Sequence, residues 1–160
     1  MSDRRSPSAR TWVAGAALAT LSLLACSKGC GETAFVGKAS GRVESTGTTG
    51  PWVIDHGECF AGDREGFFGV TVDAPAPSDA SLMFVKDPLA GWVVKATVAG
   101  SCHDKTCTYT VFTKDECKTL SVDLHLDPSR KKQLFDGSAR FDCEVDGAHV
   151  FGNLEMHACR

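Results

Sequence analysis

Cysteine and histidine are the residues of this chain with the most versatile chemistry, because both bind metals and take part in catalysis. The sequence contains eight cysteines and five histidines. Zinc sites usually combine two closely spaced ligand pairs, such as Cys-x-x-Cys with a second pair, whereas here a pair with a four-residue gap occurs once, at Cys102 and Cys107. His149 and His157 lie eight residues apart, roughly 26 Å along a strand, which is too far to share an ion. We therefore expect no metal site.

Nucleophilic catalysis has no local signature in this sequence. The chain contains neither Gly-x-Ser-x-Gly nor His-Glu-x-x-His. A Ser, His and Asp set can still assemble from distant strands, so a hydrolase with scattered site residues is the alternative to a protein without enzymatic activity. We expect the histidines on solvated strand faces or loops, with His149 partnered to Glu144. The candidates for such a scattered site are His56, His103, His125, His149 and His157.

The first 26 residues have the three parts of an export signal. Arginines precede Thr11, an apolar stretch runs from Trp12 to Ala25, and small residues lie before the cleavage point. The apolar stretch has 14 residues, fewer than the roughly 20 that a membrane-spanning helix needs. The residues Leu23-Leu24-Ala25-Cys26 resemble a bacterial lipobox. The resemblance implies removal of residues 1–25 and a diacylglyceryl thioether on Cys26, and we expect no other cofactor.

The resemblance also implies a location and a class of partner. A lipidated Cys26 places the protein in the bacterial cell envelope, held to a membrane by its acyl chains. The residue after it is Ser27 rather than the aspartate that retains such lipoproteins in the inner membrane, so the outer membrane is expected. Without residues 1–25 the chain carries 14 basic and 19 acidic residues, a net charge of −5, which argues against binding to nucleic acid.

Seven cysteines follow Cys26. In an exported protein they can form disulfides, because the compartments outside the cytoplasm are oxidising. Cys30 lies in the short tether of residues 26–32 and is expected to be a free thiol. The remaining six allow 15 connectivities, among which spacing alone does not decide. Cys102 and Cys107 flank a four-residue connection, so a hairpin there predicts a disulfide between them. The six disulfide candidates are Cys59, Cys102, Cys107, Cys117, Cys143 and Cys159.

Residues 33–160 show hydrophobic alternation with period two, punctuated by Gly, Pro and Asp. This pattern predicts an all-β fold, a single antiparallel β-sandwich or barrel-like domain stapled by disulfides. A helical turn is predicted at 130–135, and a flexible connector at 74–78. The expected strands include Gly66–Asp73, Ser81–Lys86, Trp92–Ala99, Cys107–Thr113 and Thr119–Leu126.

The clearest hairpin signal is Asp146-Gly147, a dipeptide suited to a two-residue turn. The turn fixes a register that pairs Val145 with Ala148, Glu144 with His149, Arg140 with Asn153 and Ala139 with Leu154. The same register sets Phe141 opposite Gly152, whose missing side chain leaves room for the ring. It separates Cys143 from Cys159, so these two are not expected to bond.

Aromatic side chains offer a third type of site, a stacking surface for a ligand. Phe67 and Phe68 are adjacent, so one of them must leave the core face of an extended segment. Trp52, after Gly50-Pro51, is the other candidate for exposure. The sequence as a whole favours a non-enzymatic binding or structural module at the envelope, with an envelope protein or polysaccharide as its partner. A spacer with no specific ligand and a hydrolase are the alternatives.

Overall fold

The computed structural model describes residues 36–102, 106–127 and 134–160. Within these residues, nine antiparallel strands form one sheet in the order β6-β5-β4-β3-β2-β1-β9-β8-β7. Two short 3-10 helices, η1 (Gly62–Glu65) and η2 (Lys114–Glu116), interrupt the described strands. The strands are β1 (Gly37–Gly47), β2 (Trp52–Ala61), β3 (Gly69–Asp73), β4 (Ser81–Asp87), β5 (Gly91–Thr97), β6 (Tyr109–Phe112), β7 (Cys117–Leu126), β8 (Phe135–Val145) and β9 (Ala148–Cys159).

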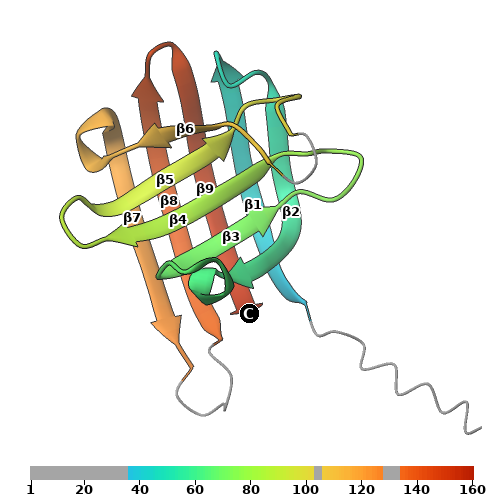
Figure 1. Cartoon of the computed structure of the whole chain (residues 1–160), viewed down its shortest axis with the longest axis vertical. Helices are drawn as coiled ribbons and strands as arrows, with labels where there is room; N and C mark the ends of the chain where they lie inside the picture. Colours follow the sequence, from blue (N-terminus) through green and yellow to red (C-terminus); the bar gives the residue numbers. More distant parts are fainter. Residues whose placement is uncertain (1–35, 103–105, 128–133) are drawn as a thin grey trace, which may run out of the picture. The chain divides into compact units, whose positions relative to one another are not determined.

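The sheet coils until it is nearly closed into a barrel (Figure 1). Strands β3 to β6 cross in front of β7, β8, β9 and β1, and the edge strands β6 and β7 are joined by η2. The rings of Phe84 on β4 and Phe141 on β8 meet edge to face at 5.5 Å between centroids, so side chains from both layers fill the interior. The all-β, antiparallel prediction is confirmed.

Alternation along the strands builds the core, as expected for a sheet with one buried face. Most inward-facing side chains of the strands other than the edge strand β7 are almost completely buried, while Leu120, Val122 and Leu124 of β7 are half-buried against them. The largest fully buried side chains are Phe84, Phe112, Phe135, Phe141, Ile54, Leu82, Leu154 and Met156.

The five predicted strands are present, but their ends differ: β4 and β7 are longer than predicted, and β3, β5 and β6 are shorter. The strand predicted from Gly66 begins at Gly69 instead, because Phe67 N–H donates to the carbonyl of Gly62 and Gly66 has a left-handed φ of 83° that ends η1. The predicted strand at 107–113 is confined to β6, because Thr113 N–H donates to Glu116 Oε2 at 2.6 Å and starts η2. Most of the predicted helical turn at 130–135 lies outside the described residues, and its last residue, Phe135, begins β8.

The β8–β9 hairpin has the predicted register at every pair named above, from Val145 with Ala148 to Ala139 with Leu154. Phe141 does face Gly152, but the physical need for this glycine is different. A Cβ on Gly152 would lie 2.1 Å from the carbonyl oxygen of Arg42 and 2.7 Å from Cα of Val43. Gly152 also has a φ of 149°, which L side chains rarely adopt, so the close approach of β1 requires the glycine.

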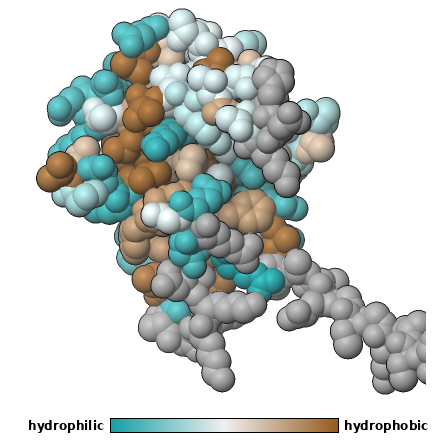
Figure 2. Space-filling model, viewed as in Figure 1, coloured by the Kyte–Doolittle hydropathy of each residue, from teal (hydrophilic) through white to brown (hydrophobic). Residues whose placement is uncertain are grey.

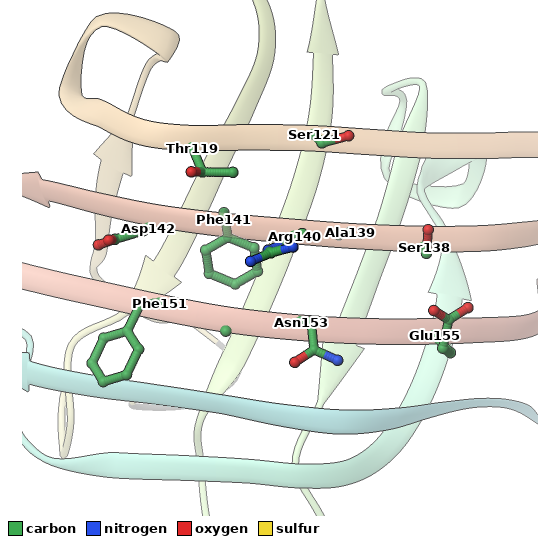
Figure 3. Close-up of a pocket in the computed structure, with 11 residues that line it drawn as sticks. Thr119, Ser121, Ser138, Ala139, Arg140, Phe141, Asp142, Phe151, Asn153 and Glu155 are labelled. Carbon is green, nitrogen blue, oxygen red and sulfur yellow. The ribbon is translucent and has the colours of Figure 1, made fainter.

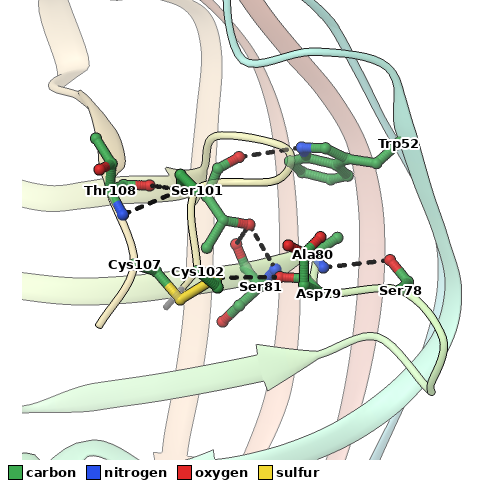
Figure 4. Close-up of a disulfide and its surroundings, with 10 residues drawn as sticks. Trp52, Ser78, Asp79, Ala80, Ser81, Ser101, Cys102, Cys107 and Thr108 are labelled. Carbon is green, nitrogen blue, oxygen red and sulfur yellow. Dashed lines mark hydrogen bonds between the residues drawn. A yellow bond between two sulfur atoms is a disulfide. The ribbon is translucent and has the colours of Figure 1, made fainter. Parts of the chain in front are cut away.

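Three disulfides join the six described cysteines: Cys59–Cys159, Cys102–Cys107 and Cys117–Cys143. The predicted Cys102–Cys107 bridge is confirmed, and Figure 4 shows it beside Ser101 and Thr108. Cys143 and Cys159 are bonded to other partners, as the hairpin register required. The lipidation candidate Cys26 and the expected free thiol Cys30 lie outside the described residues, as does His103.

The prediction that Trp52 is exposed is wrong. Its side chain is 9% exposed, and Nε1 donates a hydrogen bond of 3.1 Å to the carbonyl oxygen of Thr97 (Figure 4). Phe68 is 47% exposed, whereas Phe67 is half-buried. The part of the chain that the structure describes contains no helix long and apolar enough to cross a membrane.

Candidate functional site

The outer face of β7, β8 and β9 forms a polar groove of about 600 Å³ (Figure 3). Its side chains alternate with those that fill the core, so each strand contributes every second residue to the groove. The side chains that face it are Thr119 and Ser121 from β7, Ser138, Arg140 and Asp142 from β8, and Phe151, Asn153 and Glu155 from β9.

Strand register places these side chains in rows across the sheet. In one row, Ser121 pairs with Arg140, Arg140 with Asn153, and Asn153 with Arg42 of β1. Directly opposite residues on one face of a sheet have Cβ atoms about 5 Å apart, within reach of a shared small ligand. The row therefore presents a hydroxyl, two guanidinium groups and an amide side by side.

A second row runs parallel to the first and adds acidic and aromatic groups. Thr119 pairs with Asp142, Asp142 with Phe151, and Phe151 with Glu44 of β1. The ring of Phe151 is half-buried and lines the groove. An apolar ring thus lies between two carboxylates, close to the donors of the first row.

The two arginines of the first row differ in their electrostatic surroundings. Arg42 Nε lies 2.7 Å from Glu44 Oε1 and Nη1 lies 3.0 Å from Asp55 Oδ1, and the hydrogen bond and charge of Glu44, then the charge of Asp55, raise the pKa of Arg42. Arg140 makes no hydrogen bond or ion pair with any described residue. Its guanidinium, exposed at the centre of the groove, has donors available for a ligand.

His149 lies beside the groove, and its partner differs from the prediction. Its Nε2 is 2.8 Å from Oδ1 of Asp142 rather than bonded to Glu144, the residue directly opposite. The imidazole also stacks on Phe151, with 4.7 Å between ring centroids and 27° between planes. His149 therefore holds both the carboxylate and the ring of the second row in place.

The other described histidines do not complete a catalytic set. His125 Nε2 lies 3.1 Å from Asp123 and His157 Nδ1 lies 3.7 Å from Asp136, and of these four side chains only that of Asp136 is as much as half-buried. In residues 36–102, 106–127 and 134–160, no imidazole hydrogen-bonds a serine, threonine or cysteine side chain. The same ranges contain no group of three or more His, Cys, Asp or Glu residues arranged to hold a metal ion.

A second pocket, of about 680 Å³, lies over the outer side of β1 and β2. His56 faces Ser40 and His157 faces Lys38, so the two histidines flank β1 from opposite sides. The wall formed by residues 74–76 makes this pocket more apolar than the groove. It brings together two of the candidate histidines, and no nucleophile among the described residues is hydrogen-bonded to either imidazole.

Sequence reasoning did not identify the groove as a site. The predicted register already paired Arg140 with Asn153 on the polar face of the hairpin, and that pairing is the signal that pointed to it. Phe151 was not among the aromatic candidates, although the predicted pairing of Phe141 with Gly152 already placed it on the polar face of the hairpin. Comparisons of the chain with protein-family models, with curated proteins and with solved structures found no match.

Proposed function

We propose that this protein is a lipid-anchored lipoprotein of the bacterial outer membrane whose barrel binds an envelope saccharide in the groove of β7, β8 and β9, without enzymatic activity. The observation that carries the binding role is Arg140, a guanidinium with no described partner, placed between Asn153 and Ser121 and one row away from Phe151. The lipobox-like segment at Cys26 supports the anchored state.

The mixture of groups in the groove suits a saccharide better than a simple anion. Arg140 and Asn153 donate hydrogen bonds, while Glu155 and Asp142 accept them, so both kinds of partner are available to sugar hydroxyls. The carboxylates of Glu155 and Asp142 would repel a ligand that carries several negative charges. The half-buried ring of Phe151 offers an apolar surface to the C–H face of a pyranose.

A binding measurement with a matched control tests the proposal. The probes are soluble oligosaccharides released from bacterial peptidoglycan and from O-polysaccharide, titrated into the protein by calorimetry. Arg140→Ala is expected to weaken binding about tenfold or more, since charge-assisted hydrogen bonds contribute roughly 1.5–3 kcal/mol. Lys95→Ala is the control, because Lys95 lies on β5 in the other layer of the barrel. Equal affinities of wild type and Arg140→Ala, or no binding of either probe, would contradict the proposal.

A hydrolase is the second candidate, and the Asp142–His149 pair beside the groove favours it. A carboxylate that orients a histidine is part of many catalytic sites. The pair lacks the third member, since His149 has no described hydroxyl or thiol partner. We therefore expect the bound oligosaccharide to be recovered intact. Release of new reducing ends by the wild type, abolished in Asp142→Asn, would favour the hydrolase instead.

A further inference from the structure

An apolar ridge lies at one end of the barrel. We define it as four side chains with solvent-exposed surface, Phe68, Leu89, Trp92 and Leu126, together with the buried Phe135 beneath them. The ring of Phe68 is 5.3 Å from that of Phe135 and 6.3 Å from that of Trp92. Leu126 pairs with Phe135 in the β7–β8 ladder, so these contacts connect four of the five residues. Exposed apolar surface of this kind marks an interaction site.

Leu89 extends the ridge at the tip of the β4–β5 hairpin. It is 97% exposed, and Asp87 Oδ1 accepts hydrogen bonds from the N–H groups of Leu89 and Ala90, both at 2.8 Å. The turn is thus held by its own aspartate while the leucine side chain lies in solvent. Figure 2 shows apolar atoms at the left edge of the view, where Figure 1 draws the β4–β5 turn.

The ridge lies at the end of the barrel where β1 begins. Leu126 pairs with Phe135, Phe135 pairs with Cys159, and a Cβ on Gly37 would touch Cα of Cys159 at 2.5 Å. The first residue of β1 is therefore about two strand spacings, roughly 10 Å, from the Phe135 position. Strand register thus places the Leu126–Phe135 part of the ridge, on which Phe68 packs, at the end where the barrel starts.

The chain between the expected lipid and the barrel is short. Val36, the first described residue, is ten positions after Cys26. A fully extended chain of that length spans at most about 35 Å. A lipid on Cys26 therefore holds this end of the barrel, and with it the ridge, near the bilayer surface.

We propose that the apolar ridge seats the barrel on the zwitterionic phospholipid surface into which the acyl chains of Cys26 insert. The inference rests on the lipidation in the proposed function and is independent of the groove. Trp92 has interfacial chemistry, since the Nζ of Lys86 lies 5.1 Å from its ring centroid and pairs a cation with an aromatic face. The net charge of −5 without residues 1–25 opposes binding to an anionic surface, so apolar contact drives the seating.

Tryptophan quenching by lipid tests this arrangement in the complete lipidated protein. The protein, extracted from membranes, is reconstituted into phosphatidylcholine vesicles with or without brominated acyl chains. Bromolipid is expected to quench the wild type more than Trp92→Phe, because Trp52 is at the other end of the β1–β2 pair and hydrogen-bonded inside the barrel. The double variant Leu89→Gln/Leu126→Gln is expected to lose the additional quenching.

The matched control is Val53→Gln/Val111→Gln, which changes two exposed apolar side chains outside the ridge. Val53 is 43% exposed and Val111 45%, close to the 42% of Leu126. This control is expected to keep the quenching of the wild type. A vesicle-bound wild type that is quenched no more than Trp92→Phe, or a ridge variant quenched like the wild type, overturns the seating while the anchor stands. Protein that fails to stay with the vesicles overturns the lipidation itself.

Discussion

Cys59 on β2 and Cys159 on β9 are joined by a disulfide although β1 lies between these two strands in the sheet. Their Cα atoms are 4.8 Å apart, and both side chains are completely buried. Gly37, the first residue of β1, makes the bridge possible, because a Cβ there would lie 2.5 Å from Cα of Cys159. The bridge therefore joins the sheet on both sides of β1 at the end where β1 begins.

The Cys59–Cys159 bridge is expected to stabilise the fold more than the Cys102–Cys107 bridge. Their sequence separations are 100 and 5 residues. In the loop-entropy model, replacing both cysteines of the long loop by serine lowers the free energy of unfolding by about 4.7 kcal/mol, against about 2 kcal/mol for the short loop. Denaturant unfolding of the two double variants without reductant measures the difference. Equal losses would show that loop closure is not the source of the stabilisation.

Trp52→Phe is expected to destabilise the barrel. The change removes the hydrogen bond between Nε1 and the carbonyl of Thr97, which connects β2 with β5 in a buried position. A buried acceptor without its partner costs about 1–3 kcal/mol. Trp92→Phe is the matched control, because Trp92 is half-exposed and its described interactions use the ring face and edge rather than a hydrogen bond. A Trp92→Phe protein less stable than Trp52→Phe would contradict this account.

The β4–β5 turn is expected to loosen in acid. Backbone hydrogen bonds from Ala90 and Leu89 lower the pKa of Asp87 below its ordinary value of 3.8. A lowered pKa in the folded state means that the stabilisation is present above the ordinary value and is lost as the pH falls through the folded value. As the pH falls through the folded-state pKa of Asp87, hydrogen exchange of the Leu89 and Ala90 amides should accelerate relative to their intrinsic exchange rates. In Asp87→Ala it should already be fast at neutral pH, and protection unchanged by the substitution would refute the role of the carboxylate.

Cys26→Ser is expected to release or mislocalise the protein and to leave residues 1–25 uncleaved. The resemblance to a lipobox implies that acylation of this thiol precedes cleavage. Cys30→Ser, four residues away, is the control and should stay membrane-bound. Fractionation with mass spectrometry of the N-terminus measures both effects. A Cys26→Ser protein that keeps the location of the wild type with residues 1–25 removed, or a wild type with an unmodified Cys26, would exclude the anchor.

Local features of the fold could be predicted from the sequence, whereas its long-range order could not. The Asp146-Gly147 turn determines the register of β8 and β9 because each pair follows from the one before it. The placement of β9 between β1 and β8 depends on pairing across the whole chain, which no local pattern encodes. The Cys59–Cys159 bridge follows from that order, so spacing alone left it among the 15 connectivities.

The candidate site was predictable to the same extent. The pairing of Arg140 with Asn153 followed from the register, but the hollow that contains them results from coiling of the sheet. The predicted partner of His149, Glu144, was wrong for a related reason. A flat ladder favours Glu144, directly opposite, whereas in the coiled sheet the imidazole reaches Asp142 along the diagonal.

The position of β9 has a consequence for how the molecule is made. It is the last of the described strands along the chain, yet it supplies the ladder partners of both β1 and β8. Until residues 148–159 emerge, two long strands expose bare edges and Cys59 has no correct partner. A chain threaded across a membrane from its N-terminus would therefore need protection from early oxidation and from strand exchange with its neighbours.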